Sequence, residues 1–210
     1  SISLHGYTSA QGDLETRQAI ADYLNNTYET NFMADNLYMT MGAAASLSIA
    51  FKALTSSPDD EIIAIAPFFP EYRVFVTAAG AKFNVVAPDT KNFQINFDEF
   101  EKLVNKNTKA VIINSPNNPS GAVYSEQTIN KLADFLSKKS EEYGTHIFII
   151  TDEPYREIVY DGVEVPYVTK YYNDTIVCYS YSKSLSLPGE SIGFILVPDE
   201  AYESKKLYAA

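Results

Sequence analysis

The chain has 210 residues, of which 46% are hydrophobic and 20% are charged, so it can bury a core sufficient for one large domain or two small ones. Sixteen basic and 27 acidic residues give a net charge of −11, which argues against nucleic acid or an anionic membrane as a partner. One cysteine allows no internal disulfide, two separated histidines lack the spacing of a zinc site, and no apolar run approaches the roughly 20 residues of a membrane span, so we expect a cytoplasmic protein.

Short apolar runs alternate with helical patterns along the whole chain. Several runs, such as Ile-Phe-Ile-Ile at 147–150, are apolar on both faces. This is typical of strands in a parallel sheet that is covered by helices on both sides. The predicted strands are 37–41, 61–66, 82–86, 110–114, 146–151, 175–180 and 192–197.

Three of the intervening helices have recognisable ends. Asp13 is placed to cap the first of them, and Asp98 is placed to start the second. Ser125 is a good N-cap for the third, which Gly144 should end. The repeated strand–helix–strand units predict a three-layer α/β/α fold with right-handed crossovers and a mostly parallel sheet of about seven strands. The chain stops at 208–210 within a helical pattern, so we expect a fragment of a longer protein.

Ligands of such a sheet collect where strands end and helices begin. At 41–46, small residues that include Ala43 and Ala44 would let helix N-terminal amides approach an anion. At 67–72, two aromatic residues between prolines would form a platform for a flat ring. Tight packing at the first junction and core packing at the second are the structural alternatives.

Three later junctions carry polar residues of unusual kinds. Segment 114–121 predicts a turn, and its adjacent asparagines also offer amide donors to a ligand oxygen. Asp152 ends the most apolar strand, where a desolvated carboxylate needs a cationic or donor partner. Lys183 follows another buried strand among hydroxyl groups and could form an imine with an aldehyde. The alternatives are an ordinary turn, a salt bridge or helix cap, and a solvated lysine.

In this order, an anion site, an aromatic platform, amide donors, a buried carboxylate and an imine-forming lysine are the parts that a phosphorylated pyridine aldehyde requires. The most specific strings are Ser-Pro-Asn-Asn-Pro-Ser-Gly at 115–121, Asp-Glu-Pro-Tyr at 152–155 and Ser-Tyr-Ser-Lys-Ser-Leu-Ser-Leu-Pro-Gly at 180–189. With these strings the chain resembles the class I/II aminotransferases, fold type I enzymes that depend on pyridoxal 5′-phosphate (PLP). The resemblance runs from about Tyr7 to the end of the chain.

The resemblance implies a role for each polar junction. Lys183 matches the lysine that holds the cofactor as an imine and moves the substrate α-proton, and Asp152 matches the partner of the pyridine nitrogen. Tyr155 and Asn118 match the donors to the phenolic oxygen of the ring, and Phe69 matches the residue that stacks on it.

The resemblance also implies a phosphate site and a dimer. Tyr7 matches a tyrosine that reaches the phosphate of the neighbouring subunit, which implies a homodimer with shared active sites. Ser191 stands where the family has an arginine that pairs with the phosphate, and losing such a hydrogen bond costs about 1.5–3 kcal/mol. The residues of the implied phosphate region are Ala43, Ala44, Ser180 and Ser182.

As an aminotransferase, the protein is expected to move an amino group between an amino acid and a 2-oxo acid. Residues 1–210 would be the PLP-binding large domain, without the N-terminal segment and the C-terminal small domain of the family. The family places its substrate-carboxylate arginine in that small domain, so we expect the fragment alone to be poorly active. The alternatives are a PLP lyase or decarboxylase on the same fold, a non-catalytic PLP-binding sensor module and an inactive remnant.

Overall fold

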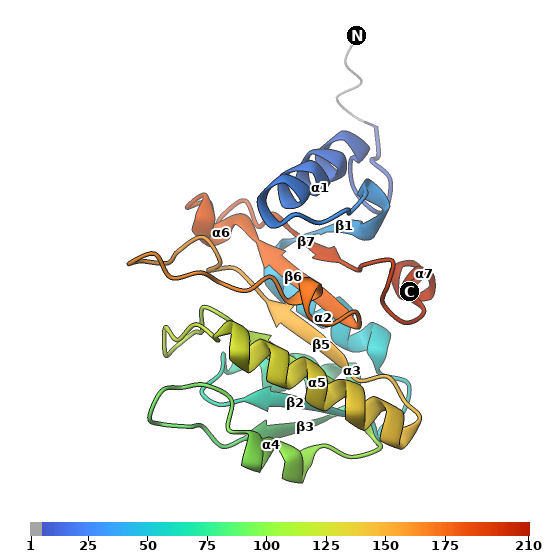
Figure 1. Cartoon of the computed structure of the whole chain (residues 1–210). Coiled ribbons are helices and arrows are strands. Elements are labelled where there is room, and N and C mark those ends of the chain that lie inside the picture. The colour runs from blue at the N-terminus through green and yellow to red at the C-terminus, as the bar shows by residue number, and fades with distance from the viewer. Residues whose placement is uncertain (1–5) are drawn as a thin grey trace.

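A seven-stranded sheet forms the centre of the computed structural model, which describes residues 6–210 (Figure 1). The strand order is β1-β7-β6-β5-β4-β2-β3. Within the described residues, β7 is antiparallel to both of its neighbours, and the other pairs are parallel. The strands are β1 (Leu37–Thr40), β2 (Glu61–Ile65), β3 (Lys82–Val86), β4 (Thr108–Asn114), β5 (Phe148–Asp152), β6 (Thr175–Ser180) and β7 (Gly193–Leu196). The mostly parallel sheet and its seven predicted strands are thus confirmed, with ends that differ by at most two residues.

The helices join these strands in the expected alternation. Asp13 and Ser125 cap α1 and α5 as predicted, since each side chain accepts a hydrogen bond from a backbone N–H three residues on. The start of α4 was predicted wrongly, because Asn96 is its N-cap and Asp98 lies in the first turn. The helices are α1 (Leu14–Tyr28), α2 (Gly42–Leu54), α3 (Glu71–Ala79), α4 (Phe97–Leu103), α5 (Glu126–Tyr143), α6 (Tyr181–Ser184) and α7 (Ser204–Ala209), with 3-10 turns η1 (Ala34–Asn36) and η2 (Val168–Lys170).

The apolar runs are explained by two cores, one on each face of the sheet. Neighbouring residues of a strand point to opposite faces. Ile62 and Ile150 therefore pack with α2 and α3, whereas Ile63 and Ile149 pack with Leu132 under α5. A third cluster packs α1 over β1 and β7 on the α5 side. Three layers result, and they fix which face each strand-end residue reaches.

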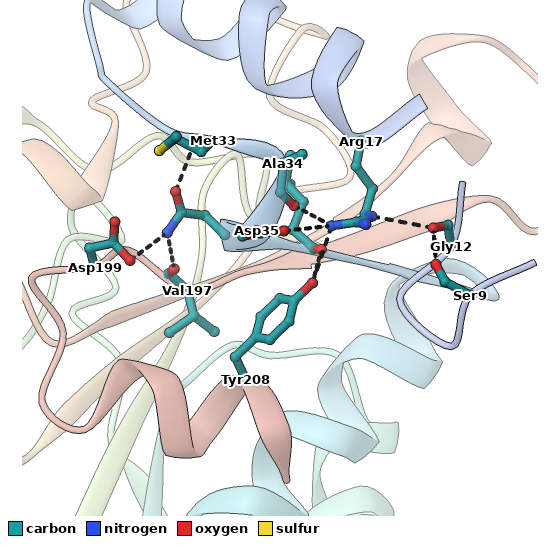
Figure 2. A network of polar contacts seen from close by, with 11 residues as sticks. Ser9, Gly12, Arg17, Met33, Ala34, Asp35, Val197, Asp199 and Tyr208 are labelled. Atoms are coloured by element: carbon teal, nitrogen blue, oxygen red, sulfur yellow. Dashed lines mark hydrogen bonds and ion pairs between the residues drawn. The ribbon is translucent and has the colours of Figure 1, made fainter. Parts of the chain in front are cut away.

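A buried arginine, Arg17, connects the first helix to the edge of the sheet through hydrogen bonds (Figure 2). The Arg17 guanidinium donates to the backbone oxygens of Ala34, at 2.7 Å, and Gly12, at 3.3 Å. It also donates to the Tyr208 hydroxyl in α7, which itself donates to the Leu37 carbonyl at 2.8 Å. Arg17 thus links α1, β1 and α7, and this internal role explains why an arginine is buried there.

Candidate functional site

The turns that follow β1, β2, β4, β5 and β6 meet around one cavity at the carboxyl edge of the sheet. Parallel strands bring these turns to the same edge. The cavity has a volume of about 350 Å³. Its lining is Met41, Gly42, Ala43, Ala44, Leu47, Phe69, Asn114, Asn118, Asp152, Pro154, Tyr155, Ser180, Ser182, Lys183, Pro188 and Ser191.

The cavity brings together almost all of the residues singled out in the sequence. Tyr7 is the exception, because it is fully exposed and does not line the cavity. Its implied role concerns a neighbouring subunit and stays a prediction. The predicted residues that do line the cavity are Ala43, Ala44, Phe69, Asn118, Asp152, Tyr155, Ser180, Ser182 and Lys183.

A close backbone contact brings the start of α2 to the end of β6. A Cβ atom on Gly193 would lie 2.3 Å from the Tyr179 carbonyl oxygen and 2.9 Å from the Gly42 Cα, so only glycine fits there. The Ser180 side chain accepts a hydrogen bond from Ser182 N, which caps the short α6. The first amides of α2, at Ala43 and beyond, therefore lie beside Ser180 at the end of β6 and Ser182 in α6, in a neighbourhood suited to an anion.

Asp152 is the acidic residue of the cavity lining, and it is buried. Its Oδ2 accepts a hydrogen bond of 2.5 Å from the Tyr72 hydroxyl, while its Oδ1 has no partner within residues 6–210. Its backbone oxygen accepts from Asn114, whose own side-chain oxygen accepts from the Asn118 amide. Burial raises the pKa of Asp152 to about 7, against the opposing effect of the Tyr72 hydrogen bond. A cationic donor at Oδ1 would therefore be needed to keep the carboxylate ionised at neutral pH.

Lys183 and Tyr155 face the same cavity from two neighbouring turns. Lys183 is exposed, and its amine has no hydrogen-bond or ion-pair partner in the described part of the chain. Burial, and secondarily the charge of Asp152, raise the pKa of Tyr155, whereas a hydrogen bond with Asn118 lowers it. The lysine amine is thus available to a ligand, and the Tyr155 phenol stays protonated near neutral pH as a donor.

Two neighbours of these residues were missed in the sequence. Tyr72 belongs to the 67–72 string, but only its packing partner Phe69 was assigned a role there. Asn114 ends β4 and holds the turn that carries Asn118. In the sequence, Tyr72 looks like a core residue and Asn114 like the end of a strand, so no local signal shows that either one contacts Asp152.

The arginines are held away from the cavity, as their positions suggested. Arg156 forms a buried, bidentate ion pair with Glu153, with contacts of 2.6 and 2.8 Å, and also donates to two backbone carbonyls. Arg73 lies over the Phe83 ring, 4.8 Å from its centre, and Arg17 is held at α1. None of the three lines the cavity.

No group of three or more His, Cys, Asp or Glu side chains within residues 6–210 could hold a metal ion. None of the helices in that range is both long and apolar enough to cross a membrane. His5, one of the two histidines, lies outside the described residues.

The family model described as aminotransferase class I and II matches residues 2–207. The chain belongs to this family. Among solved structures, an amino transferase from Eubacterium rectale shares 70% identity with a TM-score of 0.98, over 100% of this chain and 52% of that one. The aspartate aminotransferase of Thermotoga maritima shares 31% identity with a TM-score of 0.87, over 97% and 53% of the two chains.

Curated aminotransferases also match most of this chain with about half of their own length. A probable N-acetyl-LL-diaminopimelate aminotransferase of Bacillus subtilis is 32% identical over 92% of this chain and 48% of its own length. An aspartate aminotransferase of Thermotoga maritima is 34% identical over 90% and 49%. The chain therefore spans about half the length of the curated relatives it matches, and the resemblance seen in its motifs is confirmed at the level of the family.

The contact at Gly193 generates a prediction. In Gly193→Ala, the added Cβ has no space against backbone atoms, so β7 and the start of α2 must separate. We expect a loss of about 2–3 kcal/mol in the free energy of unfolding, measured by urea denaturation of the full chain. Gly189→Ala is the control, because nothing lies within 4 Å of its added Cβ. Equal stabilities of the two variants would show that the close approach is absent.

Proposed function

We propose that this chain is the PLP-binding large domain of an aminotransferase that moves an amino group between an amino acid and a 2-oxo acid. The observation that carries the proposal is that Lys183, Asp152 and Tyr155 line one cavity in a chain of this family. The buried carboxylate ends β5, the phenol lies in the turn that follows it, and the amine comes from α6, directly after the neighbouring strand β6.

The residues of the cavity fit PLP. The buried Oδ1 of Asp152 lacks a partner within residues 6–210, and a protonated ring nitrogen would supply the missing donor. Phe69 offers a ring for stacking, and Tyr155 with Asn118 would donate to the phenolic oxygen. The amides of α2 at Ala43 and Ala44, with Ser180 and Ser182, would hold the phosphate.

The residues of the chain divide the chemistry between them. When bound, PLP supplies an electron-poor ring that stabilises negative charge at the substrate α-carbon. Lys183 would hold the cofactor through its aldehyde and then, as a free amine, take up and return the α-proton. Asp152 would keep the ring nitrogen protonated. Both side chains border the cavity, so neither task needs a rearrangement of the sheet.

The substrate carboxylate needs a cation other than Lys183, which the proposed function assigns to the cofactor. No arginine lines the cavity, and the described arginines are engaged elsewhere. We therefore assign this contact to the family's small domain, and expect the 210 residues alone to transaminate poorly. We further propose a cytoplasmic homodimer in which Tyr7 reaches the phosphate of the neighbouring subunit. The similarity to aminotransferases named for aspartate and N-acetyl-LL-diaminopimelate supports amino acids as the substrate class.

The anchor of the cofactor is tested with Lys183→Ala. We expect PLP added to the full chain to give an imine absorption band and, after borohydride reduction, one stable label located by mass spectrometry at Lys183. The variant should give no such label, because it lacks the amine that faces the cavity. Lys205→Ala removes an exposed lysine outside the cavity and should be labelled like the wild type. Equal labelling of Lys183→Ala at another residue would refute the assignment.

The reaction itself is tested by its products. The PLP-loaded full-length protein that contains this chain, incubated with an amino acid and 2-oxoglutarate, should form glutamate and the matching 2-oxo acid in equal amounts. Liquid chromatography with mass spectrometry measures both products. Release of ammonia or carbon dioxide without glutamate would instead indicate a lyase or a decarboxylase.

The position of Ser191 gives a prediction about affinity. Ser191 lines the cavity where the family has an arginine, so Ser191→Arg would add a charged donor for the phosphate. A hydrogen bond of this kind is worth about 1.5–3 kcal/mol, which corresponds to roughly 10- to 150-fold tighter PLP binding. Absorbance titration of the full chain measures the change. Ser186→Arg is the control, since Ser186 has the same left-handed backbone but does not line the cavity. Equal gains in PLP affinity in both variants would mean that the added positive charge acts at a distance and not through contact with the phosphate.

A further inference from the structure

Tyr72 lies behind the cavity and reaches it only through Asp152. Its side chain comes from the first turn of α3 and is 1% exposed. The ring packs against Phe68 and Phe69, with centroids 6.4 and 5.7 Å away. Tyr72 does not line the cavity. The ring is therefore a core residue, and the hydroxyl is its one polar contribution.

The hydroxyl of Tyr72 makes the two oxygens of Asp152 different. It donates to Oδ2 at 2.5 Å, whereas Oδ1 is buried without a partner in the described chain. Rotation of a carboxylate about its last bond is otherwise soft. A hydrogen bond from a hydroxyl to a charged oxygen is shorter and stronger than one between neutral groups. The contact therefore fixes the plane of the carboxylate and favours its ionised form.

We propose that Tyr72 is a positioning residue of this site, which holds Oδ2 of Asp152 from behind so that Oδ1 alone receives the N–H of a protonated heteroaromatic ring. The proposal rests on the proposed function for the identity of that ring. Tyr72 acts through Asp152 and touches neither cofactor nor substrate. The pairing joins α3 to the end of β5, 80 residues apart in sequence.

The surroundings of Asp152 hold few charges that could replace this contact. Glu153 is paired with Arg156, so its charge is largely balanced. Cys178 lies on β6 directly opposite Asp152 in the sheet. Burial raises the pKa of its thiol, which therefore stays neutral. The titratable groups around Asp152 are Tyr72 from α3, Glu153 directly after β5, Cys178 on β6, Tyr155 from the turn after β5 and Lys183 from α6.

The proposal predicts how the stability of the cofactor-free protein depends on pH. The pKa of Asp152 is raised from 3.8 to about 7, so its contribution to stability is complete below about pH 4 and is lost as the pH rises to about 7. Tyr72→Phe keeps the ring but removes the donor that stabilises the carboxylate. The pKa of Asp152 should then rise by a further one to two units, because a hydrogen bond to a charged group is worth that much.

The first experiment measures urea unfolding of the full chain between pH 5 and 9 without PLP. The free energy of unfolding of the wild type should fall with rising pH and become constant near pH 7. That of Tyr72→Phe should continue to fall for about one to two more pH units. Tyr172→Phe is the matched control, because it loses a buried phenol hydrogen bond of 2.7 Å, to Ile147, in the opposite core cluster. It should lower stability equally at every pH. In an Asp152→Asn background, Tyr72→Phe should no longer alter the profile.

The second experiment compares PLP with its carbocyclic analogue, in which a C–H replaces the ring nitrogen. Tyr72→Phe should reduce the preference for PLP by about 10-fold, and Tyr172→Phe should leave it unchanged. A Tyr72→Phe stability profile that superimposes on the wild type overturns the positioning role and leaves the proposed function standing. Failure of the wild type to bind PLP overturns the proposed function itself, and with it the ligand assigned to Oδ1.

Discussion

Burial of the Asp152 carboxylate is the constraint around which the site is arranged. The strand that ends in Asp152 is covered on both faces, so water cannot solvate its charge, and burial raises its pKa to about 7. The protein supplies a donor from Tyr72 to one oxygen and anchors the backbone through Asn114. The other oxygen is left for a ligand. A carboxylate held in this way has its strongest interaction with a cationic N–H donor, which is what the ring nitrogen of PLP would present.

The topology of the sheet places the remaining groups around this carboxylate. Its neighbours β4 and β6 are parallel to β5, so their carboxyl ends carry Asn118 and Lys183 to the same edge. The helix α2 follows β1, which is separated from β6 by β7. It reaches the cavity because Gly42 and Gly193 let the two backbones approach. One antiparallel strand and a glycine contact therefore complete a site that the parallel strands begin.

The cavity contains groups for a cofactor but no cation for a substrate. Arg17 and Arg156 are buried in internal contacts, and Arg73 lies over an aromatic ring. Ser191 lines the cavity, so in the proposed function helix amides and hydroxyl groups would hold the phosphate. Binding of that anion would then depend on the geometry of these donors more than on charge.

The sequence by itself determined the layers of the fold and the turns that line the candidate site. Apolar runs on both strand faces, caps such as Ser125 and the strings around Asn118, Asp152 and Lys183 are local patterns, and the structure places them where they were predicted. Only the tertiary structure decided that Tyr72 donates to Asp152 and that Gly193 meets Gly42. The physical reason is that local pattern fixes backbone conformation and the buried face. Which distant side chains touch depends on strand register and helix packing, and these follow from the whole core rather than from any one segment.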